Sequence, residues 1–122
     1  MNLVVESEGA VVKLRGLIKS STPLLAMFHM EGCPHCVNLR PHWDAMIKHF
    51  KNNPKINFAE IDSKYAEQVC NLLENDFSVR GYPTIVVIRG GRKTKDYNDE
   101  RTKEALINFV NKNFLQSGGR RS

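Results

Sequence analysis

The sequence predicts an α/β sandwich, in which helices cover both faces of a sheet that mixes parallel and antiparallel strands. Two observations predict it. Short apolar runs alternate with segments whose apolar residues recur every three or four positions, in the order β-α-β-α-β-α-β-β-α. The last two strands are separated only by Gly90-Gly91, which is typical of a hairpin turn. An antiparallel pair therefore lies beside strands that are connected through helices.

The composition fits one globular domain. The chain has 122 residues, of which 41% are hydrophobic and 25% charged. A domain of this length can bury a core without disulfide bonds. The longest apolar runs, Leu24–Phe28 and Ile85–Ile88, are far shorter than the roughly 20 residues of a membrane helix. Membrane-spanning, disordered and disulfide-scaffold classes are thus excluded, and we expect one domain over residues 1–116 and a flexible basic tail at 117–122.

The first half of the chain contains two expected strands and two expected helices. Leu3–Val5 is a short strand candidate. The helix expected over Glu8–Lys19 has Ser7 as its N-cap, a residue type that accepts a hydrogen bond from the first turn. Pro23–Phe28 is apolar and begins with proline, which suits a buried strand. The next helix, Pro34–Phe50, has one apolar side formed by Leu39, Trp43, Met46, Ile47 and Phe50.

The second half predicts three strands and two helices. Ile56–Ile61 alternates apolar and polar residues, which indicates a strand. Asp62-Ser63 can cap a helix, and Thr84–Arg89 follows it as a buried strand. Arg92–Tyr97 is a charged strand that suits the edge of a sheet. The last helix is expected over Thr102–Leu115. The apolar positions of the capped helix are Val69, Leu72, Leu73 and Phe77.

The chemistry lies at Cys33-Pro34-His35-Cys36, directly after an apolar strand and at the start of a helix. A thiolate is the attacking form of cysteine, and the unpaired amides of a helix N-terminus favour a negative charge on Cys33. Pro34 fits the first turn, where its missing N–H is not needed, and His35 adds a donor or a positive charge beside the sulfur. We expect Cys33 to attack, and Cys36, more buried and less acidic, to resolve the mixed disulfide.

A zinc half-site is the alternative for this pair of cysteines. Structural zinc needs about four ligands, and the third cysteine, Cys70, stands alone in an apolar helical stripe. A Cys-x-x-Cys pair beside a β-α-β pattern favours redox chemistry over metal binding. We therefore expect no metal and no cofactor other than the Cys33–Cys36 disulfide itself. Cys70 is expected to be a small core residue, with redox regulation as the alternative.

These features resemble the thioredoxin superfamily, and within it the catalytic domains of protein disulfide isomerases. The resemblance covers residues 11–115. It rests on the strand that leads into the Cys-x-x-Cys helix and on Pro41 within that helix. It rests further on Val79-Arg80-Gly81-Tyr82-Pro83-Thr84 and on Tyr97-Asn98-Asp99-Glu100-Arg101. The resemblance implies the thioredoxin fold.

The resemblance also implies roles for single residues. Pro83 would follow a cis peptide bond, and Tyr82 and Pro83 would hold an extended substrate beside the reactive cysteine. A plain proline at the start of a strand is the alternative. Gly32 stands where the family commonly has tryptophan, which would open the site and alter substrate contact. Arg101 would approach the site and favour the thiolate of Cys36, the alternative being a solvated arginine at the start of a helix.

One departure from the family concerns the proton of the second thiol. The family usually has a buried Asp or Glu six residues before the first cysteine, which accepts that proton. Met27 occupies this position here and cannot accept a proton. Cys36 must therefore lose its proton to water, to His29 or to a substrate group. A structural histidine on an apolar strand is the alternative interpretation of His29.

We expect a thiol–disulfide oxidoreductase of the disulfide isomerase or oxidase type, acting on protein cysteines. The Pro-His pair between the cysteines resembles that of the bacterial periplasmic disulfide oxidants. Stabilising the thiolate of Cys33 favours a potential more oxidising than that of a thioredoxin. A reducing thioredoxin-type protein, and a non-enzymatic thioredoxin-fold adaptor or chaperone, are the alternatives.

The start of the chain and its charge bear on compartment and partners. No basic segment followed by a long apolar stretch opens the sequence, so we expect a cytoplasmic protein, or a lumenal one if the chain is an excised domain. We expect a monomer that acts on protein thiols and disulfides with an unidentified redox partner, without membrane or nucleic-acid binding. Residues 80–122 hold ten Lys or Arg and four Asp or Glu, so an anion-binding surface is the alternative to a solvated basic face.

Overall fold

The computed structural model describes residues 1–115, and the predicted tail at 117–122 lies outside the described residues. The expected α/β class and the expected order of elements are confirmed. The strands are β1 Asn2–Val5, β2 Leu24–His29, β3 Asn57–Asp62, β4 Thr84–Arg89 and β5 Arg92–Asp96. The helices are α1 Glu8–Lys19, α2 Pro34–His49, α3 Ala66–Cys70 and α4 Lys103–Val110, with a 3-10 turn at Ser63–Tyr65 and a π-helical turn at Asn111–Leu115.

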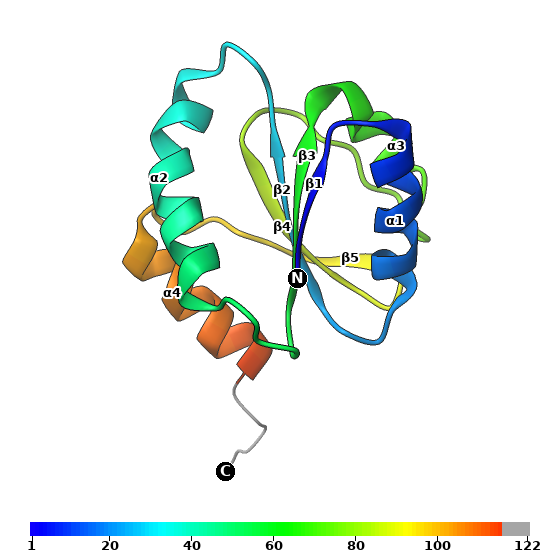
Figure 1. The fold of residues 1–122 in the computed structure, drawn as a ribbon. Coiled ribbons are helices and arrows are strands. Elements are labelled where there is room, and N and C mark those ends of the chain that lie inside the picture. The colour runs from blue at the N-terminus through cyan, green and yellow to red at the C-terminus, as the bar shows by residue number, and fades with distance from the viewer. Residues whose placement is uncertain (116–122) are drawn as a thin grey trace.

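The five strands form one mixed sheet in the order β1-β3-β2-β4-β5. β1 and β2 run parallel to β3, whereas β4 runs antiparallel to both β2 and β5. Helices α2 and α4 cover one face of this sheet, and α1 and α3 cover the other (Figure 1). The carboxyl end of the central strand β2 leads over the top of the sheet into α2. A rigid strand thus fixes the residues that begin α2.

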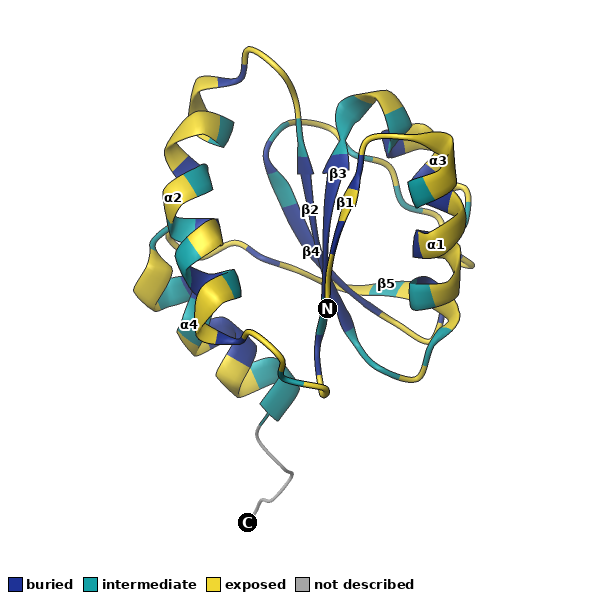
Figure 2. Cartoon of the chain, in the orientation of Figure 1, coloured by how far each residue is buried: buried dark blue, intermediate teal, exposed yellow. Residues whose placement is uncertain are grey.

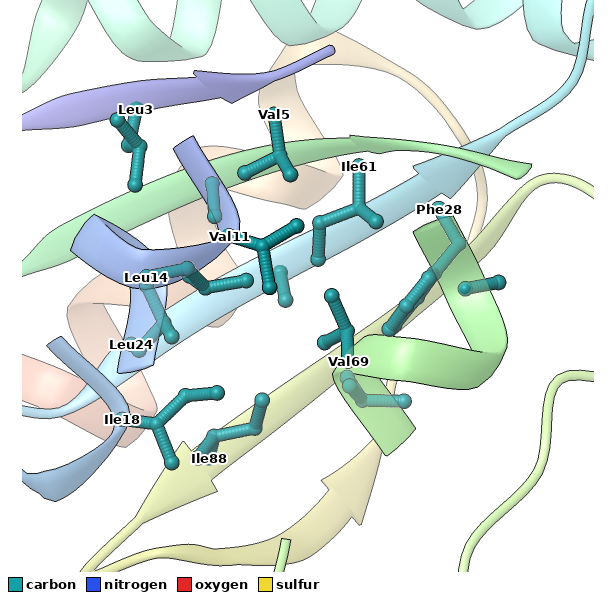
Figure 3. Packing of buried hydrophobic residues seen from close by; sticks show 14 of the residues in the cluster. Leu3, Val5, Val11, Leu14, Ile18, Leu24, Phe28, Ile61, Val69 and Ile88 are labelled. Atoms are coloured by element: carbon teal, nitrogen blue, oxygen red, sulfur yellow. The ribbon is translucent and has the colours of Figure 1, made fainter. Parts of the chain in front are cut away.

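Each face of the sheet has its own apolar core. Figure 2 shows the three central strands β2, β3 and β4 mostly in the colour of buried residues, while each helix has a solvent-facing side. On the α1/α3 face, Leu14 and Val69 point from the helices toward the strands (Figure 3). On the α2/α4 face the fully buried Trp43, Met46 and Leu106 belong to one apolar cluster. No helix among the described residues is long and apolar enough to span a membrane.

Local capping explains where two helices begin. The side chain of Ser7 accepts a hydrogen bond from the amide of Ala10 at 3.1 Å, so α1 starts where the sequence predicts. Thr102 accepts from the amide of Ala105 at 3.1 Å and caps α4. The last helix is less regular than predicted, because its final turn, Asn111–Leu115, is π-helical.

The third helix is shorter than predicted. It ends at Cys70, although the apolar pattern continues to Phe77. Beyond its end the side chain of Asn75 bonds to the backbone of Lys93 in both directions, at 2.7 and 2.9 Å. These hydrogen bonds tie the segment to the start of β5 and replace the bonds of a longer helix. Tertiary contacts therefore decide the end of α3.

Candidate functional site

Cys33 is the N-cap residue of α2. Its Sγ accepts a hydrogen bond from the amide of Cys36 at 3.1 Å, and Pro34 occupies the first helical position. The free amides and the positive end of the helix dipole therefore face this sulfur, and both favour negative charge on it. Cys33, Cys36 and Cys70 all carry free thiols in this structure.

The loop before β4 lies against Cys33. The Cys33 thiol donates to the carbonyl oxygen of Tyr82 over 3.6 Å, and the Tyr82–Pro83 peptide bond is cis, as the resemblance implies. Pro83 is buried and Tyr82 is partly exposed. Because β4 begins at Thr84 and pairs antiparallel with β2, the start of β4 meets the end of β2. The sheet itself thus brings residues far apart in sequence to one edge.

The two thiols differ in exposure in the opposite sense to the one expected. Cys33 is only 6% exposed, because the loop at Tyr82 covers it, whereas Cys36 is partly exposed. The prediction that Cys36 is the more buried thiol is therefore wrong. Partial burial nevertheless raises the pKa of Cys36 to about 11, and its hydrogen bond with Cys33 acts in the same direction. The backbone of Met30 and the charge of Arg101 oppose this rise in the pKa.

Cys36 borders a pocket of about 420 Å³ at the start of α2, which His29, Met30, Val37 and Arg40 also line. Gly32 lies at its rim with φ of +78°, a left-handed conformation that favours glycine and lets the chain turn from β2 into α2. Within residues 1–115, no group of three or more His, Cys, Asp or Glu side chains is placed to hold a metal ion.

A buried carboxylate that the sequence analysis missed lies behind this pocket. Glu60 on β3 is 6% exposed and accepts hydrogen bonds from Arg40 at 2.7 Å, Trp43 at 3.1 Å and Asn2 at 3.0 Å. Burial opposes ionisation of Glu60, but these three donors outweigh it and lower the pKa of the carboxyl. Glu60 therefore stays ionised and anchors α2 to the sheet through Arg40.

The pairing of strands places Glu60 next to Met27, the residue that stands where the family usually has a buried carboxylate. Glu60 lies directly beside Met27 in the pairing of β2 with β3. The signal in the sequence was an acidic residue inside the buried stretch Phe58–Ile61, one strand away from the expected position. The site thus contains a buried carboxylate, but its oxygens are occupied by cationic and neutral donors.

The segment before α4 brings Arg101 toward the site. The Tyr97 hydroxyl donates to the carbonyl of Glu100, and the amide of Lys103 donates to Nδ1 of His42 on α2 at 3.0 Å. Arg101 is exposed, and its charge lowers the pKa of Cys36. His35 is also exposed, and in the described part of the chain no hydrogen bond joins it to either cysteine of the pair.

Comparison with known proteins decides the family. Residues 13–112 match the family model described as Thioredoxin. The chain belongs to the thioredoxin family. A protein disulfide-isomerase of Datisca glomerata is 31% identical over 106 residues, which are 87% of this chain and 20% of that protein. A thioredoxin domain-containing protein 5 homolog of Drosophila melanogaster is 32% identical over 85 residues, 70% of this chain and 20% of that protein.

Solved structures show the same thioredoxin fold. The first thioredoxin domain of mouse protein disulfide-isomerase A4 superimposes with a TM-score of 0.65 at 23% identity, covering 98% of this chain and 81% of that one. This chain spans about a fifth of the length of the curated relatives that it matches. It is thus a thioredoxin-like protein with relatives of the disulfide-isomerase type, which supports thiol–disulfide oxidoreductase chemistry at the level of the family.

Proposed function

We propose that this thioredoxin-family protein exchanges disulfides with protein cysteines, as an oxidase or isomerase, through Cys33 and Cys36. One observation carries the proposal. The Sγ of Cys33 sits at the amino end of α2, accepts the amide of Cys36 at 3.1 Å, and lies beside the Tyr82–Pro83 loop. Helix amides that meet a sulfur in this way favour its thiolate, which is the form that enters disulfide exchange.

In the exchange, the sulfur–sulfur bonds form and break only between the two cysteines and the substrate thiols. In the oxidising direction a substrate thiolate attacks Cys33 of the oxidised pair, which forms a mixed disulfide and releases Cys36 as a thiolate that takes up a proton. A second substrate thiolate then attacks the substrate sulfur, forming the substrate disulfide and releasing the Cys33 thiolate.

In isomerisation the reduced pair acts instead, and the Cys33 thiolate attacks a substrate disulfide, which forms a mixed disulfide and releases one substrate thiolate. Another substrate thiolate then attacks the substrate sulfur of the mixed disulfide, which forms a different substrate disulfide and releases the Cys33 thiolate. Where no such thiolate attacks, Cys36 attacks Cys33, which oxidises the pair and releases the substrate in reduced form.

Several features support an oxidising protein over a reducing one. A stabilised Cys33 thiolate favours the reduced pair, so the pair gives up its disulfide more readily. Pro34 and His35, between the cysteines, are proposed to tune this balance. Tyr82 and Pro83 are proposed to bind extended substrate backbone, and Gly32 leaves the entrance beside Cys33 without a side chain.

Trapping of a mixed disulfide tests the proposal. Cys36→Ala should accumulate a covalent complex with scrambled ribonuclease, which contains disulfides, because Cys33 attacks and nothing then displaces the product. The complex should run as a band that a reductant abolishes on gel electrophoresis. Cys33→Ala is the matched control and should trap none. Failure of Cys36→Ala to form any mixed disulfide contradicts the proposal.

The reduction potential separates the alternatives. Thioredoxin has a potential of about −270 mV and protein disulfide isomerase about −180 mV, and we expect a value nearer to the second. Equilibration with glutathione buffers followed by thiol alkylation measures it. A value near that of thioredoxin indicates the reducing alternative. Client binding that persists in a Cys33→Ala/Cys36→Ala double variant, without any exchange by the parent, indicates an adaptor or chaperone.

A further inference from the structure

His29 is the polar side chain of the site that the exchange chemistry leaves unassigned. It ends β2, and its Nε2 atom is buried without a hydrogen-bond partner among the described residues. Buried polar atoms in native proteins are nearly always paired, so an unpaired one calls for an explanation. The side chain lines the same pocket as Cys36, and the backbone of the adjacent Met30 interacts with the Cys36 thiol.

The chemistry of the second thiol requires a proton acceptor. Burial and the hydrogen bond with Cys33 raise the pKa of Cys36 to about 11, so this thiol is protonated at neutral pH. It must lose that proton before it can attack the mixed disulfide, because the thiolate is the nucleophile. An acceptor held beside the thiol would raise the rate of this step.

The other charged groups around the pocket are less suitable acceptors. Glu60 accepts three hydrogen bonds, and its carboxyl has a lowered pKa, so its tendency to take a further proton is weak. Arg40 and Arg101 are cations and take up no proton. Asp62, beside His29 in the sheet register, accepts the amide of Lys64 at the turn after β3.

Glu31 and Tyr82 are two further titratable groups at this end of the sheet. Glu31 lines the pocket from the loop, but it is exposed to solvent rather than held beside the thiol. Tyr82 is neutral at physiological pH, since burial raises the pKa of its hydroxyl above the ordinary value. His29 thus combines a buried Nε2 atom that has no hydrogen-bond partner among the described residues with a side chain that lines the same pocket as Cys36.

We propose that His29 accepts the proton of Cys36 in the step that resolves the mixed disulfide. The inference rests on the function proposed above. The Cys36 proton moves to Nε2 of His29 as the Cys36 sulfur attacks Cys33. The Cys33–Cys36 bond forms, the bond from Cys33 to the substrate sulfur breaks, and the substrate leaves as a thiolate. The imidazolium then returns its proton to the substrate thiolate or to solvent, while the cysteine pair is oxidised and the substrate disulfide is reduced.

A single-turnover reaction separates the two steps. The reduced protein is mixed with oxidised glutathione and quenched with acid, and mass spectrometry then resolves the free, mixed-disulfide and internally oxidised forms. His29→Gln should slow conversion of the mixed disulfide by about 10- to 100-fold, the scale of general-base catalysis. Formation of the mixed disulfide should stay within about twofold, because Cys33 performs that step without His29.

Two control variants show whether a slower second step in His29→Gln is due to the loss of His29 as a base. His49→Gln alters an exposed histidine on α2 away from the pocket and should leave both rates unchanged. An unchanged second step in His29→Gln, or equal slowing of both steps, overturns the proposal, as does an equal effect of Glu31→Gln on the second step. If His29→Gln fails to fold, His29→Asn replaces it.

The pH profile provides a readout that a purely structural role would not change. In His29→Gln the second-step rate should rise tenfold per pH unit toward the ionisation of Cys36 near pH 11, because the thiol must then ionise into solvent. In the parent the rate should depend less steeply on pH, because a base held near the thiol takes its proton during the attack. A parent profile as steep as that of His29→Gln overturns the proposal. Failure of the proposed function would appear differently, as absence of the first step.

Discussion

The two faces of the sheet are packed differently, and the difference locates the chemistry. The α1/α3 face is filled by aliphatic and aromatic side chains such as Leu14 and Val69 (Figure 3). The α2/α4 face has an apolar core of similar extent, but it also contains Glu60, the one buried charged side chain within residues 1–115. Arg40 and His29 lie on this same face beside the start of α2.

The buried cysteines on the two faces show what this difference does. Cys70 is the last residue of α3, where burial raises the pKa of its thiol and the backbone of Val79 offsets this only in part. Cys33 is equally shielded from solvent, but it sits at the first turn of α2, where the amide of Cys36 meets its sulfur. We therefore expect the position of a thiol on its helix, rather than its burial, to decide whether it reacts.

The largest expected effect tests this contrast directly. Cys33→Ser should lower the rate of insulin disulfide reduction by more than about 1,000-fold, because a hydroxyl replaces the thiolate nucleophile. Cys70→Ser removes a thiol of similar burial and should keep the rate within about threefold. Turbidity of the precipitating insulin chains measures both. Loss of activity in Cys70→Ser would show that the two faces are not chemically distinct.

The apolar face should respond to loss of volume. Leu14→Ala should lower the free energy of unfolding by about 3 kcal/mol, because the removed atoms leave a cavity in a fully buried site. Val12→Ala, at a position 70% exposed on the same helix, should cost less than about 0.5 kcal/mol. Urea unfolding measures both values. Similar costs for the two variants would contradict the packing of α1 against the sheet.

The polar face should respond to loss of charge. Glu60→Gln should lower the free energy of unfolding at neutral pH by about 2 kcal/mol, because the partly buried guanidinium of Arg40 loses its buried counter-charge and keeps only the exposed Asp44. Asp44→Asn removes the exposed second partner of Arg40 and should cost less than about 0.5 kcal/mol. Urea unfolding at neutral pH measures the free energy of unfolding of both variants. Equal losses would contradict the prediction that the buried Glu60 holds Arg40 more strongly than the exposed Asp44 does.

Glu60→Gln and Leu14→Ala should also differ in how their cost to the free energy of unfolding depends on pH. Folding lowers the pKa of Glu60 below its ordinary value of 4.5, so the folded state binds fewer protons than the unfolded state. The stability due to ionised Glu60 is therefore complete above pH 4.5 and is lost as the pH falls through the lower folded pKa. The difference between the parent and Glu60→Gln should shrink over this acid range, whereas the cost of Leu14→Ala should not. Urea unfolding at successive pH values measures both differences.

The smallest expected effect concerns Arg101. Because its charge lowers the pKa of Cys36, Arg101→Gln should raise that pKa and slow resolution of the mixed disulfide by about two- to fivefold. Lys103→Gln removes a nearby exposed cation and should leave the rate unchanged. The acid-quench reaction with oxidised glutathione measures both, and high salt should reduce the difference. Equal rates for parent and Arg101→Gln would mean that Arg101 is simply a solvated residue.

The reactive segment and most elements follow from the sequence, because their causes are local. The bounds of α1 depend on Ser7 and on apolar residues within the same helix. The place of Cys33 at the start of α2 depends on the adjacent Pro34 and on the apolar strand just before it. The cis peptide bond before Pro83 could be predicted only from the family resemblance, because X-Pro bonds are cis in only about 5–6% of cases in folded proteins.

Tertiary structure alone decided which groups surround the thiols. The sequence placed Met27 where a carboxylate was expected, but it did not show that Glu60 lies beside Met27 on the next strand, because register between distant strands is not a local property. The position of the two cysteines on α2 predicts that Cys36 is the more buried thiol. The loop at Tyr82 covers Cys33 instead, so Cys33 is the less exposed of the two. The sequence by itself determined the fold class and the candidate reactive pair. Packing between strands and helices determined that His29 has a buried, unpaired nitrogen and that its side chain lines the same pocket as Cys36.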